Sequence, residues 1–225
     1  MTRLIIVRHA EASGNVDRIF HGQTNSNITK NGEAQLICLK ERFKNIDFDV
    51  IYSSDLERAM QTAFAVNNYK KLSINVEKGL REINGGDWEN VHFDELSILY
   101  PNEFQIWNKE LHNLQMPNGE SVRSFSIRLK ETNENIIKKH KGKTICIVTH
   151  GTAIRVLMCF AKKLTIEQID TVSWCDNSAI SIVEYDDNFN PKIMLEGDSS
   201  HLHKGLSTIE NQDWWILFNK GEKKK

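Results

Sequence analysis

The sequence predicts an α/β fold of three layers, in which helices cover both faces of a mostly parallel central sheet. Two short apolar runs, Leu4–Val7 and Thr144–Thr149, indicate strands that are buried on both faces. Between and after these runs, apolar residues recur at the spacing of helices that pack one face on such a sheet. Strand and helix patterns that alternate in this way are typical of α/β proteins.

The composition is that of an ordinary globular protein without a dominant charge. The chain has 225 residues, of which 40% are hydrophobic, and its 29 Lys and Arg nearly balance its 30 Asp and Glu. This balance gives no field that would favour nucleic acid or an acidic membrane as a partner. The four cysteines form no C-x-x-C pair, and no apolar run reaches the length of a membrane span. We therefore expect a cytoplasmic protein.

No linker rich in Pro, Gly or Ser and no internal repeat divides the chain. A single domain over residues 1–225 is expected, with an irregular C-terminal tail from about residue 204. In that tail, Trp214, Trp215 and Phe218 suggest a part that packs down, and Lys223–Lys225 is most simply a solvated end.

The first strand ends in a charged pair, Arg8-His9, where a turn residue would be expected in a purely structural segment. Ligands of open α/β sheets collect just beyond the carboxyl ends of the strands. The pair is therefore a candidate anion site with a nucleophile or base built in. Residues 10–29 are polar and predict a long loop, and Thr29 is placed to cap the helix that follows.

A second strand is predicted over Val50–Tyr52, and Ser54 and Glu57 fit a capping box that would begin a helix at Asp55. One core face of that helix is formed by its apolar positions, Leu56, Ala59, Met60, Ala63 and Phe64. Arg58 lies in the first turn, where a cation opposes the helix dipole. It is either a surface arginine compensated by Glu57 or a residue that reaches the crevice of Arg8-His9, and position alone does not separate the two.

The middle of the chain predicts an edge strand over Leu72–Val76. Glu82 follows in a glycine-rich segment, where it is either ordinary surface charge or, if held beside cations, a general acid. Residues 93–113 predict two short helices broken before Pro101, placed to cover the mouth of the crevice. A longer amphipathic helix is predicted over residues 122–136.

The second buried strand stops at His150-Gly151, and a strongly apolar helix follows. This arrangement puts an imidazole and free backbone N–H groups at a helix N-terminus, where anions bind readily. A lone histidine is more often structural, but His150 repeats the strand-end placement of His9. Further on, Ala179–Val183 and Lys192–Leu195 predict a hairpin that closes one edge of the sheet.

Two arginines and a helix N-terminus can neutralise the oxygens of a phosphoryl group. The sequence has no aspartate cluster for magnesium, no G-x-x-x-x-G-K-[ST] loop and no C-x₅-R signature. His201 and His203 have no carboxylate or cysteine at a spacing that suits a metal. We therefore expect no metal and no cofactor, and phosphate chemistry with an imidazole nitrogen as the nucleophile.

Four ordered motifs resemble those of the histidine phosphatase superfamily, which is phosphoglycerate mutase-like in fold. They are Val7-Arg8-His9-Ala10-Glu11 with Asn15, Ser53-Ser54-Asp55-Leu56-x-Arg58, Leu80-Arg81-Glu82 with Trp88-Glu89, and Val148-Thr149-His150-Gly151. Further matches are Gly22-Gln23 and the segment Pro117-x-Gly119-Glu120-Ser121 that leads to Arg128. The resemblance runs from about Leu4 to His203, with Ala10 standing where the family usually has glycine.

The resemblance implies a role for each matching residue. His9 attacks phosphorus, and Arg8, Arg58 and His150 surround the phosphoryl oxygens. Glu82 protonates the departing alkoxide and then activates water. Three further residues are implied as phosphate or substrate contacts, Asn15, Gly151 and, at the pocket rim, Gln23.

Within the family, the short 93–113 region resembles the broad-specificity phosphatase branch more than the mutases. We therefore expect a metal-independent phosphomonoester hydrolase that forms a phosphohistidine on a small phosphorylated metabolite. The alternatives are a phosphoglycerate mutase and, less favoured, a non-catalytic module that binds phosphorylated ligands. Neither nucleic acid nor membrane is expected as a partner, and the sequence leaves a homodimer open.

Overall fold

The computed structural model describes residues 1–212 of the chain. The expectations for Trp214, Trp215, Phe218 and Lys223–Lys225 lie outside these residues, and the single domain over 1–225 stays a prediction. None of the helices within residues 1–212 combines the length and the apolar character that a membrane span requires. After the last strand, residues 199–212 run without helix or strand.

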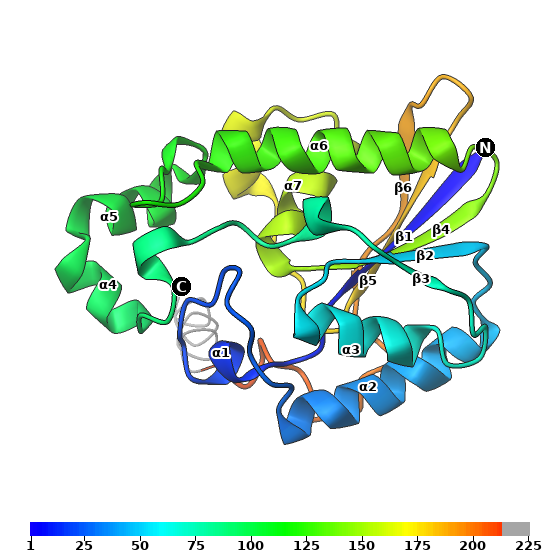
Figure 1. Ribbon diagram of the computed structural model, residues 1–225, viewed down its shortest axis with the longest axis horizontal. Coiled ribbons are helices and arrows are strands. Elements are labelled where there is room, and N and C mark those ends of the chain that lie inside the picture. The colour runs from blue at the N-terminus through cyan, green and yellow to red at the C-terminus, as the bar shows by residue number, and fades with distance from the viewer. Residues whose placement is uncertain (213–225) are drawn as a thin grey trace, which may run out of the picture.

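A sheet of six strands in the order β3-β2-β4-β1-β5-β6 forms the centre of the molecule (Figure 1). The strands are β1 (Thr2–Arg8), β2 (Val50–Ser53), β3 (Ile74–Val76), β4 (Thr144–Thr149), β5 (Ile180–Tyr185) and β6 (Pro191–Asp198). The pairs of β1 with β4, β4 with β2, and β2 with β3 are parallel, whereas β5 pairs antiparallel with β1 and β6. The mostly parallel sheet, the edge strand and the closing hairpin are thereby confirmed.

Helices cover both faces of this sheet. They are α1 (Ser13–Val16), α2 (Lys30–Arg42), α3 (Glu57–Val66), α4 (Phe93–Leu99), α5 (Pro101–Lys109), α6 (Val122–Lys139) and α7 (Gly151–Ala161). Short 3₁₀ helices join them at Phe43–Asn45, Lys78–Leu80, Gly86–Trp88, Leu111–Asn113 and Ile166–Thr171. In Figure 1, α6 and α7 lie above the sheet and α2 and α3 below it, which gives the expected three layers.

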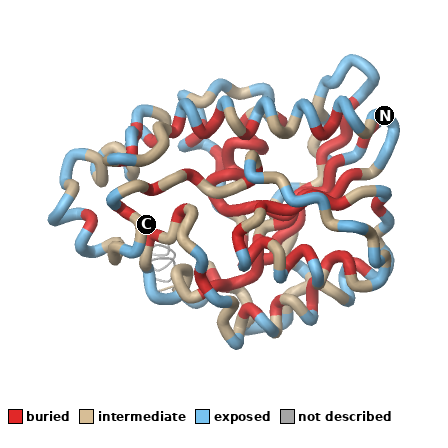
Figure 2. The backbone as a smooth tube through the Cα atoms, viewed as in Figure 1, coloured by how far each residue is buried: buried red, intermediate tan, exposed pale blue. Residues whose placement is uncertain are grey.

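The side chains of β1 divide between two hydrophobic cores. Leu4 and Ile6 pack in the cluster that contains the residues of α6 and α7, whereas Ile5 and Val7 pack with those of α2 and α3. All four are 0–1% exposed, and Figure 2 shows the buried strands running through the middle of the molecule. The apolar run therefore reflects burial on both faces, as the sequence indicates.

Helix starts agree with the sequence at α2 and differ at α3. The Thr29 hydroxyl accepts a hydrogen bond from the Gly32 N–H at 2.9 Å and caps α2 as predicted. The predicted capping box of α3 is wrong, because the helix begins at Glu57 and the Ser54 hydroxyl lies 2.8 Å from the His150 ring. Phe64, expected in the core, is 62% exposed.

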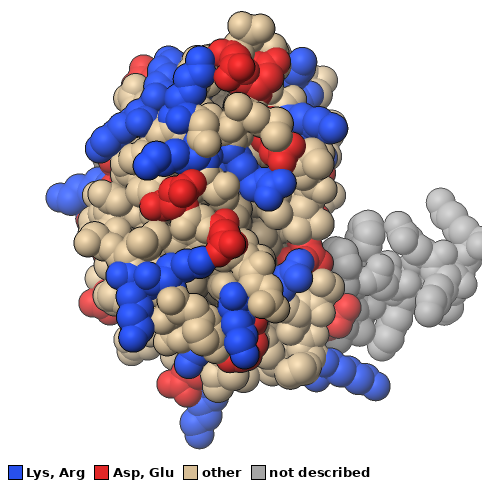
Figure 3. Space-filling model, turned by 90° about the vertical axis from the view of Figure 1, so that its right-hand side faces the viewer, with Lys and Arg blue, Asp and Glu red and all other residues tan. Residues whose placement is uncertain are grey.

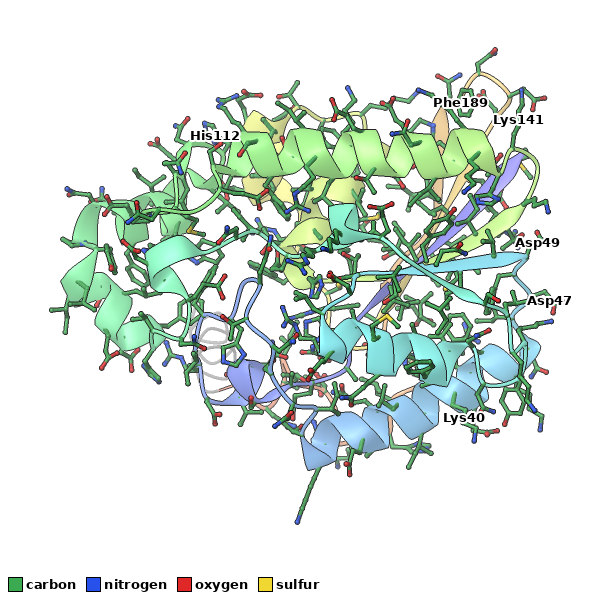
Figure 4. The ribbon with its side chains drawn as sticks, viewed as in Figure 1. Lys40, Asp47, Asp49, His112, Lys141 and Phe189 are labelled. Carbon is green, nitrogen blue, oxygen red and sulfur yellow. The ribbon has the colours of Figure 1, made fainter. Side chains whose placement is uncertain are left out.

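The two ends of the molecule differ in character. Helices α4 and α5, broken before Pro101 as predicted, lie at the end towards which β1 runs (Figure 1). At the other end, where β1 begins, basic and acidic side chains are interspersed (Figure 3). There the Lys141 ammonium lies 5.8 Å from the centre of the Phe189 ring and so joins the β5–β6 turn to the loop after α6 (Figure 4). The candidate site residues lie away from this charged end.

Candidate active site

Three parallel strands bring the predicted site residues to one edge of the sheet. Val7 of β1 and Ser53 of β2 are both in register with Val148 of β4, so the three strands end at the same level. His9 follows β1, and its backbone N–H donates to the Thr149 carbonyl at 2.9 Å. Residues that are far apart in the sequence therefore meet because parallel strands have their carboxyl ends together.

The His9 imidazole is 4% exposed, and its Nδ1 lies 2.8 Å from the carbonyl oxygen of Ala10. Because a carbonyl can only accept, this contact assigns the ring proton to Nδ1 and leaves the lone pair on Nε2. Burial lowers the pKa of His9 well below its ordinary value of 6.5, and the charges of Arg58 and Arg8 lower it further. His9 is therefore a neutral imidazole with one free nitrogen.

His150 lies beside His9, with 5.2 Å between the ring centres, and is fully buried. Its Nε2 is 2.8 Å from the Ser54 hydroxyl, while its Nδ1 has no hydrogen-bond partner. Burial lowers the pKa of His150 well below 6.5, and the nearby Arg58 adds to this effect. The two rings thus form a neutral pair at the strand ends.

Two guanidinium groups approach these rings from different elements. Arg58 of α3 is 3% exposed and donates to the carbonyls of Thr24 at 2.8 Å and Gly22 at 2.6 Å. Burial lowers its pKa to about 10, which leaves it charged at neutral pH. Arg8 donates to the Cys175 carbonyl at 2.5 Å. Arg58 is therefore not a solvated surface arginine. Of the two alternatives that the sequence leaves open, the structure shows the one in which its side chain reaches the crevice of Arg8-His9.

The carboxylate of Glu82, in the loop after β3, lies near the same arginines, Arg58 and Arg8. Its carboxylate oxygens accept the backbone N–H groups of Ile83 at 2.9 Å and Thr152 at 3.0 Å. Burial raises the pKa of Glu82, although these two N–H groups and the charges of Arg58 and Arg8 oppose the rise. A carboxyl group whose pKa is raised keeps more of its protonated form near neutral pH, as a proton donor requires.

A half-buried ion pair holds the loop that carries Glu82. Arg128 of α6 contacts Glu120 through two nitrogens at 2.8 Å each, and it donates to the carbonyls of Gly79 at 2.9 Å and Glu82 at 3.2 Å. Glu120 in turn accepts the N–H of Asn84 at 2.8 Å. The planar guanidinium therefore fixes the loop on both sides of Glu82.

One cavity of about 510 Å³ connects these groups. Six of the predicted site residues line it, Arg8, His9, Asn15, Arg58, Glu82 and Gly151. His150, whose ring centre lies 5.2 Å from that of His9, is fully buried and is not among the lining residues. Gln23, expected at the rim, is not among the lining residues, and its amide donates to the Glu82 carbonyl and accepts from Arg81 at 3.1 Å each.

Comparison with known proteins identifies the family. The profile of the histidine phosphatase superfamily (branch 1) matches residues 4–195. The chain belongs to this superfamily. Phosphoserine phosphatase 1 of Hydrogenobacter thermophilus is 30% identical to this histidine phosphatase over 87% of the chain and 92% of the relative. Phosphoglycerate mutase-like protein 4 of Arabidopsis thaliana is 29% identical, with coverages of 89% and 87%.

Among solved structures, YhfR of Bacillus stearothermophilus superposes with a TM-score of 0.86 at 30% identity, covering 90% of this chain and all of that one. The predicted family and fold are confirmed. This histidine phosphatase is an enzyme of the phosphatase or mutase type. Within residues 1–212, no three His, Cys, Asp or Glu side chains gather in a way that could hold a metal ion.

Two parts of the site were missed in the sequence. Asn177, fully buried before β5, donates to the His9 carbonyl at 2.9 Å and lies 3.3 Å from the Asn15 amide oxygen. The irregular segment after residue 204 also returns to the site, where the Gln212 amide donates to the Asn15 carbonyl at 3.1 Å. Neither segment has a periodic pattern, so only the fold reveals their positions.

The buried imidazoles make the stability of this histidine phosphatase depend on pH. An unfolded histidine takes up a proton near pH 6.5, whereas native His9 and His150 stay neutral there. The unfolded chain then binds more protons, so the free energy of unfolding falls as the pH is lowered through 6.5. Histidine NMR should show no protonation of His9 at pH 6.5, its signal being assigned from a His9→Ala spectrum. A His9 midpoint at or above 6.5 would contradict this prediction.

Proposed function

We propose that this histidine phosphatase hydrolyses small phosphomonoesters through a phosphohistidine on His9, without a metal ion. The observation that supports this most directly is the neutral His9 ring, with Nε2 free, beside the buried guanidinium of Arg58 and the half-buried one of Arg8. A phosphoryl group needs a nucleophile and positive charge around its oxygens, and these residues supply both. A protonatable carboxyl, Glu82, lines the same cavity.

In the first step, His9 Nε2 attacks phosphorus and the bond between phosphorus and the ester oxygen breaks. Arg8 and Arg58 bind the phosphoryl oxygens from the cavity wall, and His150 acts from beside His9, where we assign its ring proton to the unpartnered Nδ1 with the Ser54 hydroxyl donating to Nε2. The Asn15 amide and the Gly151 backbone contribute further contacts from the cavity wall. Glu82 gives its proton to the departing alkoxide, so the alcohol leaves neutral.

In the second step, water replaces the alcohol. The Glu82 carboxylate takes a proton from the water as its oxygen bonds to phosphorus, and the bond between phosphorus and His9 breaks. Inorganic phosphate leaves, His9 is again neutral, and Glu82 is again protonated, so protons and atoms balance. The same carboxyl therefore serves as acid and then as base.

The test is release of phosphate from p-nitrophenyl phosphate with and without EDTA. We expect equal release in both, together with a phosphoenzyme that is labile to acid, as a phosphohistidine is. Activity that EDTA abolishes would contradict the metal-free mechanism. No release under either condition would favour the module that only binds phosphorylated ligands.

The mutase activity is the second candidate, because a relative with 29% identity is named phosphoglycerate mutase-like. A mutase must keep its phosphorylated product and present it again, whereas a phosphatase admits water to the intermediate. Incubation with 3-phosphoglycerate and a trace of bisphosphoglycerate separates the two. Formation of 2-phosphoglycerate without free phosphate would overturn our proposal.

For the compartment we propose the cytoplasm, because all four cysteines are free thiols and three of them are buried. For partners we propose small phosphorylated metabolites, since the cavity is of a size suited to one small molecule.

Arg128 allows a test of the loop that holds Glu82. Replacing it with methionine removes the donors to the carbonyls of Gly79 and Glu82 and leaves Glu120 unpaired. We expect kcat for an alkyl phosphate to fall by about 10- to 100-fold, because Glu82 is displaced from its working position. Stopped assays with propyl phosphate measure this, and Arg123→Met, at an exposed position of α6, is the matched control. Equal kcat in both variants would show that the ion pair does not position Glu82.

A further inference from the structure

The cavity is much larger than a phosphoryl group and has an aromatic outer wall. Its volume is about 510 Å³, a size typical of sites for whole small molecules. Beyond the groups that face phosphate, it is lined by five aromatic side chains, Phe20, Phe93, Phe104, Trp107 and Trp174. The space next to the ester oxygen is therefore shaped by rings rather than by charges.

These rings form one continuous surface that starts at the phosphate end. The ring of Trp174 lies 3.1 Å from where a Cβ on Gly151 would be, and the Arg155 guanidinium covers it at 4.6 Å from the ring centre. The centre of Trp107 is 6.4 Å from that of Trp174 and 5.6 Å from that of Phe20. A leaving group that extends from the phosphoryl site must pass along this wall.

The cations of the cavity are already engaged. Arg8 and Arg58 belong to the phosphoryl end, and the other basic residues among the described lining are Arg18 and His21. The Arg18 guanidinium lies 3.1 Å from the Asp94 carboxylate. Burial and the nearby Arg58 lower the pKa of His21, so its ring is neutral at pH 7. The described lining thus holds no unpaired cation for a substrate carboxylate.

We propose that the preferred substrates are phosphate monoesters whose alcohol carries a neutral aromatic ring near the ester oxygen. This rests on the hydrolysis proposed above and specifies its leaving group. The ring would lie against Trp107 and Trp174, in edge or offset contacts that aromatic pairs favour. Esters whose alcohol carries a carboxylate, such as phosphoserine, would lose this contact and find no free cation.

The experiment compares three esters of primary alcohols: 2-phenylethyl phosphate, propyl phosphate and O-phospho-L-serine. Because burial of a ring adds to transition-state binding, we expect kcat/KM for the phenylethyl ester to exceed the other two by about 10- to 100-fold. In Trp107→Ala and Trp174→Ala, the ratio of phenylethyl to propyl kcat/KM should fall by about 10-fold. A general folding defect lowers both terms of that ratio and leaves it unchanged.

Phe64→Ala is the matched control, because it removes an aromatic ring that is 62% exposed on α3 and does not line the cavity. This variant should keep the wild-type ratio. Equal or faster hydrolysis of phosphoserine by the wild type, or a ratio unmoved in both tryptophan variants, would overturn the substrate class. Hydrolysis of p-nitrophenyl phosphate in the same assay tests the proposed function separately. If this ester is hydrolysed, only the substrate class fails, whereas no phosphate release from any ester would overturn the substrate class and the proposed hydrolysis together.

Discussion

We expect His9→Ala to lower kcat for phosphate release by about 10⁴-fold or more, the largest effect of any single substitution in this chain. His9 presents a free Nε2 at the cavity, because its Nδ1 is held at 2.8 Å from the Ala10 carbonyl. His150 cannot take over, because it is fully buried, does not line the cavity and has its Nε2 2.8 Å from the Ser54 hydroxyl. The measurement is phosphate release from p-nitrophenyl phosphate, together with the loss of the acid-labile phosphoenzyme.

His203→Ala is the control for this substitution, since His203 is an exposed histidine of the described chain. His9→Ala should still bind inorganic phosphate, because Arg8 and Arg58 are held by the carbonyls of Cys175, Thr24 and Gly22 and not by the imidazole. Wild-type turnover in His9→Ala would show that another group attacks phosphorus. If the variant lost phosphate binding as well as turnover, the substitution would instead have disrupted the structure of the site.

The fold could be predicted well because its signals are local. The apolar run of β1 reports burial on both faces, and the Thr29 cap and Pro101 mark helix starts through the hydrogen bonds that each can or cannot make. The start of α3 could not be predicted in the same way. Ser54 fits a capping box, but its hydroxyl pairs with His150, which is 96 residues away. A long-range contact there outweighs the local preference.

The candidate site likewise contains residues that local motifs predict and residues that only long-range contacts place. His9, Arg58 and Glu82 follow recognisable motifs and meet in one cavity, because strand ends and loops at one edge of a parallel sheet converge. The sequence did not reveal Asn177, which lies before an antiparallel strand, nor that the Gln23 amide pairs with Glu82 and Arg81. Such positions depend on side-chain hydrogen bonds across the fold. They leave no periodic pattern in the chain.

Glu82→Gln should have the second largest effect, and that effect should depend on the leaving group. For propyl phosphate we expect kcat to fall by about 10²- to 10⁴-fold, because an amide cannot donate the proton that the alkoxide needs. For p-nitrophenyl phosphate the first step needs no such proton, since p-nitrophenolate is a stable anion. Only the second step, in which Glu82 activates water, is then slowed.

Rapid-quench kinetics should therefore show a burst of p-nitrophenol, equal in amount to the enzyme, and accumulation of phosphohistidine in Glu82→Gln. Glu57→Gln makes the same change at an exposed position in the first turn of α3 and should behave as wild type. An equal fall in kcat for both substrates, without a burst, would mean that Glu82 supports the site structurally and transfers no proton. A burst with p-nitrophenyl phosphate and none with propyl phosphate requires one carboxyl to act in both steps. The raised pKa of Glu82 allows this, because burial keeps the protonated form accessible while the hydrogen bonds from Ile83 and Thr152 stabilise the carboxylate.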